Sequence, residues 1–210
     1  PRAFSLPFGI EASFLQERRT DLGYTRTVLG MGFSRSIGHL TGKAGFTSET
    51  VSGDSLAGAD VLGIEAGLIW AALDNPANPR SGARYAAGRS YSRKRYRYAD
   101  TGNASLARST IGVEHYIPLY RSHTAAFRID YRHVEAGNHA IDPSDRWWIG
   151  WPSTLRGYPE RAFPAERALL ATTEYRILTG GMSRVFAFMD YARLWNTELI
   201  EGRRVLHGDD

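Results

Sequence analysis

Residues 125–132 read Ala-Ala-Phe-Arg-Ile-Asp-Tyr-Arg, and apolar and charged side chains alternate along this stretch. In an extended chain, Phe127 and Ile129 point to one side and Arg128 and Asp130 point to the other. A period of two predicts a β-strand with one apolar and one polar face. The alternation alone leaves open whether the apolar face packs into a protein core or faces lipid.

The same alternation recurs along most of the chain. Only residues 83–98 alternate poorly, and no helical stripe replaces the pattern there. The alternating segments are 8–14, 29–34, 40–49, 62–70, 108–117, 125–132, 169–177 and 185–191. Together with residues 83–98 they predict about nine strands, most of them near the 9–11 residues that cross a bilayer when tilted. The predicted fold class is therefore all-β and antiparallel, and at this point either a transmembrane β-barrel or a soluble sandwich or lipocalin-like barrel.

Composition narrows the class of protein. The chain has 210 residues, of which 42% are hydrophobic and 23% charged, and these values predict a folded chain. The longest uncharged run, residues 147–155, is too short for a transmembrane helix, which needs about 20 residues. The absence of cysteine excludes disulfides and thiolate sites. A net charge of +4 permits contact with an anionic surface without requiring nucleic acid.

The predicted connections favour a membrane barrel over a soluble sandwich or a lipocalin-like barrel. Short and long connections are predicted to alternate, which is typical of outer-membrane barrels with short turns on one rim and long loops on the other. The connection at 17–23 is a short exception. The predicted turns are 35–39, 74–82, 119–123 and 178–183, and the predicted longer connections are 52–60, 93–104, 136–166 and the tail after Asn196.

The connection at 136–166 stands out because it is long, has no strand pattern and holds three tryptophans. A connection of this length inside a compact domain is usually functional. It contains the sequence Leu155-Arg156-Gly157-Tyr158.

Three segments in order resemble the bacterial surface antigen family, which includes barrel-assembly insertases and two-partner secretion transporters of outer membranes. Residues 155–158 are similar to its (V/L)-R-G-(F/Y) loop motif, and Glu174-Tyr175-Arg176 to an E-[YF]-R strand end. Residues 188–192, Phe-Met-Asp-Tyr-Ala, match F-x-D-x-G except that Ala192 replaces the glycine. The resemblance covers residues 146–196; upstream it rests on the strand pattern.

The resemblance implies that the motif loop folds into the barrel lumen and that Arg156 points at Glu174 and Asp190. The period of two independently places both carboxylates on the polar face, with Arg176 beside them. A guanidinium can bridge two acids through bidentate hydrogen bonds that a lysine cannot reproduce. Gly157 is then expected at a tight reversal and the Tyr158 ring on the inner wall. The alternative is a set of ordinary surface and lumenal charges.

The family barrel has sixteen strands, so residues 1–210 are expected to form a single partial barrel domain with an inward-folding loop at about 136–166. The chain begins at Pro1 in strand-like sequence, which suggests a mature form or a fragment. The family also implies upstream periplasmic polypeptide-binding repeats.

Motifs for enzyme chemistry are missing. Residues 38–44 look like a P-loop but are one residue short, and no G-x-S-x-G or H-E-x-x-H occurs. No catalytic residue, metal site or cofactor is predicted, and the chain is not expected to be an enzyme. The basic, tyrosine-containing stretch 93–98 could stack on nucleic-acid bases. In a barrel it instead lies at the outer rim, beside anionic lipopolysaccharide; no nucleic-acid partner is predicted.

The expected function is insertion, assembly or translocation of polypeptides at the bacterial outer membrane. The expected partners are unfolded outer-membrane or secreted polypeptides, outer-membrane lipids and lipopolysaccharide. Three alternatives remain open: a passive pore, a barrel that anchors or secretes a passenger domain, and a soluble sandwich.

Overall fold

A computed structural model describes residues 8–53, 58–97, 103–137, 139–151, 154–200 and 203–209. The strands in these residues are β1 (Phe8–Arg19), β2 (Tyr24–Ile37), β3 (Leu40–Gly53), β4 (Ala59–Leu73), β5 (Gly82–Tyr96), β6 (Asn103–Pro118), β7 (His123–Glu135), β8 (Trp147–Ile149), β9 (Phe163–Ala165), β10 (Arg167–Leu178), β11 (Arg184–Ile200) and β12 (Arg203–Asp209). Within the described part of the chain, no helix has the length and apolar character needed to span a membrane.

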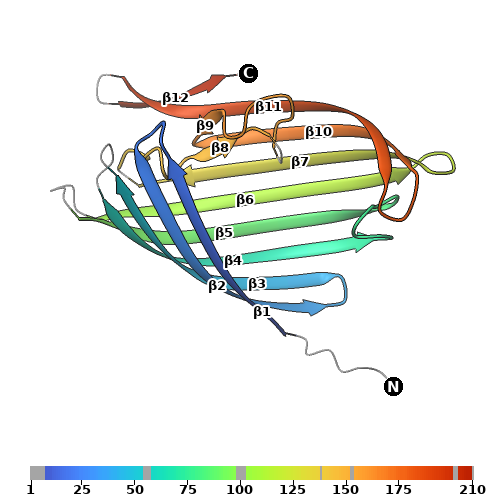
Figure 1. Ribbon diagram of the computed structural model, residues 1–210, viewed down its shortest axis with the longest axis horizontal. Coiled ribbons are helices and arrows are strands. Elements are labelled where there is room, and N and C mark those ends of the chain that lie inside the picture. Colours follow the sequence, from blue (N-terminus) through green and yellow to red (C-terminus); the bar gives the residue numbers. More distant parts are fainter. Residues whose placement is uncertain are drawn as a thin grey trace. The chain divides into compact units, whose positions relative to one another are not determined.

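One sheet contains ten strands in the order β1-β2-β3-β4-β5-β6-β7-β10-β11-β12, and β8 pairs separately with β9 (Figure 1). Chain neighbours are therefore sheet neighbours, except where β8 and β9 interrupt the connection from β7 to β10. Antiparallel registers run through β1–β2, β2–β3, β7–β10, β10–β11 and β11–β12. The predicted all-β antiparallel architecture is confirmed.

The ten strands of the main sheet agree with the prediction of about nine, but the prediction for the C-terminal tail is wrong. The tail after Asn196 was expected to be a long connection, but β11 continues to Ile200 and β12 starts at Arg203. Residues 194–200 of β11 pair with residues 203–209 of β12. This segment mixes charged and apolar residues without strict alternation, so its pairing rather than its pattern identifies it as a strand.

The predicted contrast between short and long connections holds only in part. The connections predicted to be short at 17–23, 35–39, 119–123 and 178–183 are short in the structure, at 20–23, 38–39, 119–122 and 179–183. The connections predicted to be long at 52–60 and 93–104 are shorter than expected, because β3, β4, β5 and β6 have 14 to 16 residues and extend further than the alternating segments. Among the connections between the described strands, only that at 136–166 is long.

That long connection is also more ordered than its sequence predicts. Trp147 pairs with Ala165, and Ile149 pairs with Phe163, so β8 and β9 form a small antiparallel ribbon. Strands of three residues are too short to show a period of two, which explains why the pattern missed them.

The apolar rows of the main sheet are exposed. On β1, the exposed fractions of Phe8, Ile10 and Phe14 are 61%, 73% and 67%. No described residue covers these side chains, which excludes the soluble-sandwich alternative for this face. Such a large apolar surface indicates contact with a membrane or another protein.

The chain divides into two compact units. The first comprises Pro1–Leu68, Gly88–Ser109 and Val134–Asp145, and the second comprises Ile69–Ala87, Thr110–His133 and Arg146–Asp210. The second unit has a small apolar cluster beneath the long connection, with buried Ile149, Leu155 and Leu170. This cluster positions the motif described next.

Candidate functional site

The motif Leu155–Tyr158 lies between β8 and β9. Leu155 is buried in the apolar cluster and fixes the start of the motif, while Gly157 has φ +90°, a conformation that favours glycine. The Tyr158 ring packs edge-on against Phe163 of β9, with ring centroids 5.1 Å apart. The described ring contact of Tyr158 is thus with a residue of the same connection. The sequence analysis instead expected the Tyr158 ring to pack on the inner wall, which the main strands form.

Arg156 binds two carboxylates on neighbouring strands. Its Nε and Nη2 atoms donate to the two carboxylate oxygens of Asp190 at 2.8 and 2.7 Å. Its Nη1 atom donates to Glu174 Oε1 at 2.6 Å, and its backbone N–H donates to Asp190 at 3.1 Å. We call this group of Arg156, Glu174 and Asp190 the arginine clamp.

The strand register brings the two acids together. Asp190 on β11 is opposite Thr172 on β10, and Glu174 is two residues further along β10 on the same face. An arginine in front of the β10–β11 pair can therefore reach both carboxylates, and hydrogen bonds between ionised groups are the strong ones.

An aromatic ring completes the arginine clamp. The Arg156 guanidinium carbon lies 3.7 Å from the centroid of the Phe188 ring, within the range of a cation–π contact. Phe188 precedes Asp190 by two residues and therefore shares its face of β11. The alternation predicted that Phe188 lies on the polar face but did not explain why an aromatic ring is there. The contact with the Arg156 guanidinium explains it.

The ion pairs continue beyond the arginine clamp. Arg176 Nε donates to the second oxygen of Glu174 at 2.6 Å, and the Arg176 guanidinium stacks near Tyr116 of β6. The Tyr116 hydroxyl donates to Glu114, which also accepts from Arg84 of β5. With the exception of Arg84, these polar side chains line a hollow of about 250 Å³ in the second unit.

The electrostatics favour a permanent clamp over proton transfer. Hydrogen bonding to Asp190 raises the pKa of Arg156, so its guanidinium stays charged. Arginine is a poor proton donor at any accessible pH. What this arrangement can do chemically is hold the connection against two adjacent strands.

The end of the connection is attached to β11 by side-chain hydrogen bonds. The Asn196 amide donates to the carbonyl of Pro164, and its oxygen accepts from the backbone N–H of Glu166. The buried Glu166 carboxylate in turn accepts from the N–H of Thr197. The second half of the connection is thus bound at its motif and at its end.

The sequence analysis missed a second cluster, which holds the first half of the connection within the first unit. Lys94 of β5 is 1% exposed, and its Nζ donates to Asp142 at 2.5 Å and to Asp145 at 2.6 Å. Arg108 of β6 also donates to Asp145, at 3.1 Å. We call this group the lysine anchor.

The signal for the lysine anchor was present in the basic stretch 93–98. Arg93 and Arg95 are exposed, whereas Lys94 is buried, so the stretch alternates like any other strand segment. Because the whole stretch was interpreted as a basic rim, the inward-facing side chain of Lys94 was not predicted. Tyr98 lies outside the described residues.

Comparison with known proteins assigns the chain to a family. Residues 16–203 match the model of the Omp85 superfamily domain. One similar solved structure is the crystal structure of BamA from Haemophilus ducreyi lacking POTRA domains 1-3, with 13% sequence identity and a TM-score of 0.47. The match covers 90% of this chain and 52% of that chain. No curated protein matches the chain.

The family match spans most of the chain, from β1 to the start of β12, and includes the motif, both acids of the arginine clamp and the lysine anchor. The chain is therefore part of an antiparallel outer-membrane β-barrel, and it belongs to the Omp85 superfamily.

Proposed function

We propose that this chain is the part of an outer-membrane barrel that supports insertion, assembly or translocation of polypeptides, and that it does so without catalysing a reaction. The observation that carries the proposal is the arginine clamp, in which one guanidinium binds Asp190 and Glu174 on adjacent strands.

The proposed role of the clamp is mechanical. The side chains of Glu174 and Asp190 are 10% and 5% exposed, so neither carboxylate can regain full hydration if Arg156 leaves. Breaking a buried ion pair by removing one partner costs about 3–5 kcal/mol. The clamp therefore keeps the connection docked and the β10–β11 wall in shape while a polypeptide contacts the barrel.

The proposed partners follow from this role. They are unfolded outer-membrane or secreted polypeptides, together with outer-membrane lipids and lipopolysaccharide. Periplasmic polypeptide-binding repeats in the same protein would deliver the polypeptides. A passive pore and an anchor for a passenger domain are the competing functions.

The test is Arg156→Ala in the full-length protein in its own outer membrane. We expect the barrel to remain folded, shown by heat-modifiable migration, while protease cuts residues 136–166 faster and other barrel proteins assemble more slowly. Glu160→Ala is the matched control, because Glu160 is in the same connection, its side chain is exposed and its contact with Arg161 is long, at 3.8 Å.

Normal assembly and unchanged protease sensitivity of Arg156→Ala would refute the proposed role. Ion conductance by the purified protein, with no effect of its depletion on other barrel proteins, would favour the passive pore instead.

A further inference from the structure

An apolar hollow of about 630 Å³ lies on the exposed face of β2–β5 in the first unit. Its volume is in the range of small-molecule sites, about 300–1,000 Å³. Leu29, Phe46, Leu62 and Tyr91 line it, each with more than half of its surface exposed. These side chains belong to the apolar rows that face lipid in an outer-membrane barrel.

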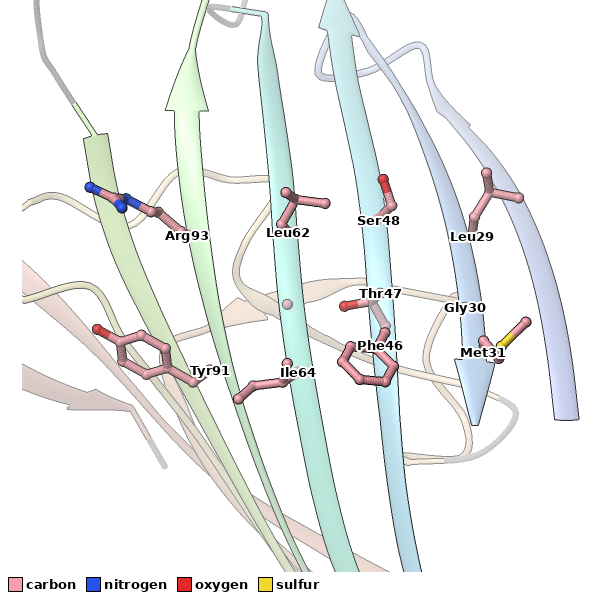
Figure 2. A pocket seen from close by; sticks show the side chains of 11 residues that line it. Leu29, Gly30, Met31, Phe46, Thr47, Ser48, Leu62, Ile64, Tyr91 and Arg93 are labelled. Atoms are coloured by element: carbon pink, nitrogen blue, oxygen red, sulfur yellow. The ribbon is translucent and has the colours of Figure 1, made fainter. Parts of the chain in front are cut away.

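The hollow exists because one small side chain interrupts a row of large ones. Figure 2 shows Ser48 between Leu29 and Leu62, with Phe46 below it in the next row. The register agrees, because Leu29 pairs with Ser48 and Met31 pairs with Phe46. A flexible hydrocarbon chain can fill such a gap, whereas an uninterrupted row of large side chains would leave no gap to fill.

Arg93 lies at the edge of the same hollow (Figure 2). It is exposed, and none of the described acidic residues forms an ion pair with it. Arg95 is likewise exposed. Arg97 differs from Arg93 because it forms an ion pair with Asp60. A lipid-facing arginine is costly at mid-membrane and tolerated near the interface, where it can meet an anionic headgroup.

The strand direction places Arg93 near the outer leaflet. Arg93 is three residues before the end of β5 at Tyr96, and its neighbour Lys94 binds Asp142 of the long connection. Long connections of outer-membrane barrels lie on the extracellular side. The headgroup nearest Arg93 is therefore that of an outer-leaflet lipid.

We propose that this hollow is a binding site for lipopolysaccharide. One acyl chain lies among Leu29, Phe46 and Leu62, and a phosphate of the lipid A headgroup pairs with Arg93. The guanidinium fork suits a phosphate, which accepts two parallel hydrogen bonds. The site is independent of the arginine clamp, and its test does not depend on polypeptide assembly.

The test measures retention of purified lipid A, carrying both phosphates, by the full-length protein in detergent, using native mass spectrometry. Arg93→Gln should weaken binding by about tenfold, as expected for losing one charge-assisted contact. Ser48→Leu should also weaken binding, because it fills the hollow with a side chain that remains compatible with lipid. Arg35→Gln, an exposed arginine toward the opposite end of β2, is the matched control and should bind like the wild type.

Three results would overturn the proposal. The first is equal binding by the wild type and Arg93→Gln, and the second is unchanged binding by Ser48→Leu. The third is equally strong binding of phosphatidylglycerol, which would make the site a general one for anionic phospholipids. Heat-modifiable migration of each variant confirms that it is folded.

Discussion

At the scale of single residues, the account depends on the shape of one guanidinium. Arg156 directs three side-chain nitrogens at three carboxylate oxygens, and its flat face lies on the Phe188 ring. A lysine carries the same charge but offers a single nitrogen without a planar face. Charge alone therefore does not explain why an arginine occupies this position.

This geometry predicts that Arg156→Lys is only a partial substitute. It should lose about 1–3 kcal/mol of loop docking, because at least one buried carboxylate oxygen loses its partner. The protease cleavage rate of residues 136–166 should lie between those of the wild type and Arg156→Ala. A cleavage rate equal to that of the wild type would show that the positive charge, and not the planar geometry of the guanidinium, holds the connection.

Sequence reasoning could anticipate only part of this site. The family resemblance implied that Arg156 points at Glu174 and Asp190, and the period of two placed both acids on the polar face, because motif order and alternation can be read from the chain order alone. The contact of Arg156 with Phe188, and the burial of Lys94 against Asp142 and Asp145, depend on where the connection lies over the sheet. No local pattern contains that information.

At the scale of elements, the lysine anchor predicts a second weak point in the long connection. Lys94→Met should leave Asp145, itself only 2% exposed, with Arg108 as its remaining cationic partner, at a cost of about 3–5 kcal/mol. Residues 136–145 should then be cut faster by protease. Arg95→Met, a change in the neighbouring exposed arginine, should have no effect, and equal cleavage of the two variants would contradict the anchor.

The turn at residues 74–81 is also held by one carboxylate. Asp74 accepts hydrogen bonds from the backbone N–H groups of Asn75, Arg80 and Ser81. The ordered turn then lets Asn78 donate to the carbonyls of Gly180 and Ser183 in the β10–β11 turn. A single ionised side chain thus supports the contact between two turns of the second unit.

This turn should depend on pH. Burial raises the pKa of Asp74, but the backbone donors outweigh it and the net pKa is lowered. The stabilisation is therefore complete above the unfolded pKa of about 4 and lost as pH falls through the folded value. The hydrogen-exchange protection factors of the backbone amides in residues 75–81, which are corrected for the pH dependence of the intrinsic exchange rate, should fall below about pH 4 in the wild type. Asp74→Asn should remove this fall, and a fall that persists in the variant would contradict the role of Asp74.

Strand positions were predictable and strand ends were not. The alternation located the centres of the main strands other than β5, because one face of each is apolar, whereas β5 falls in the poorly alternating residues 83–98. The ends of β11 and all of β12 lack this contrast, and β8 and β9 are too short to display it. Hydrogen bonding to a neighbour extends these strands, and that neighbour lies elsewhere in the sequence.

At the scale of the whole molecule, apolar and charged rows alternate within each unit. In the first unit, rows such as Phe8, Ile10 and Phe14 are exposed and the lysine anchor is buried. In the second unit, Met189 and Tyr191 are exposed on the face of β11 opposite Asp190 of the arginine clamp. In an outer-membrane barrel the apolar rows meet hydrocarbon and the charged rows meet water. The clamp, the lipid site and the proposed function all require this orientation.

Single cysteines test the orientation most directly, because the chain has no cysteine of its own. On β1, Ala12→Cys places a thiol on the apolar face and Ser13→Cys places one on the polar face. In the second unit, Ala187→Cys on β11 probes the apolar face and Thr172→Cys on β10 probes the polar face. With the full-length protein in the outer membrane or in vesicles, we expect a water-soluble maleimide to label positions 13 and 172 quickly. Fluorophores at positions 12 and 187 should be quenched by brominated acyl chains. Fast aqueous labelling at positions 12 and 187, with lipid quenching at 13 and 172, would contradict the account.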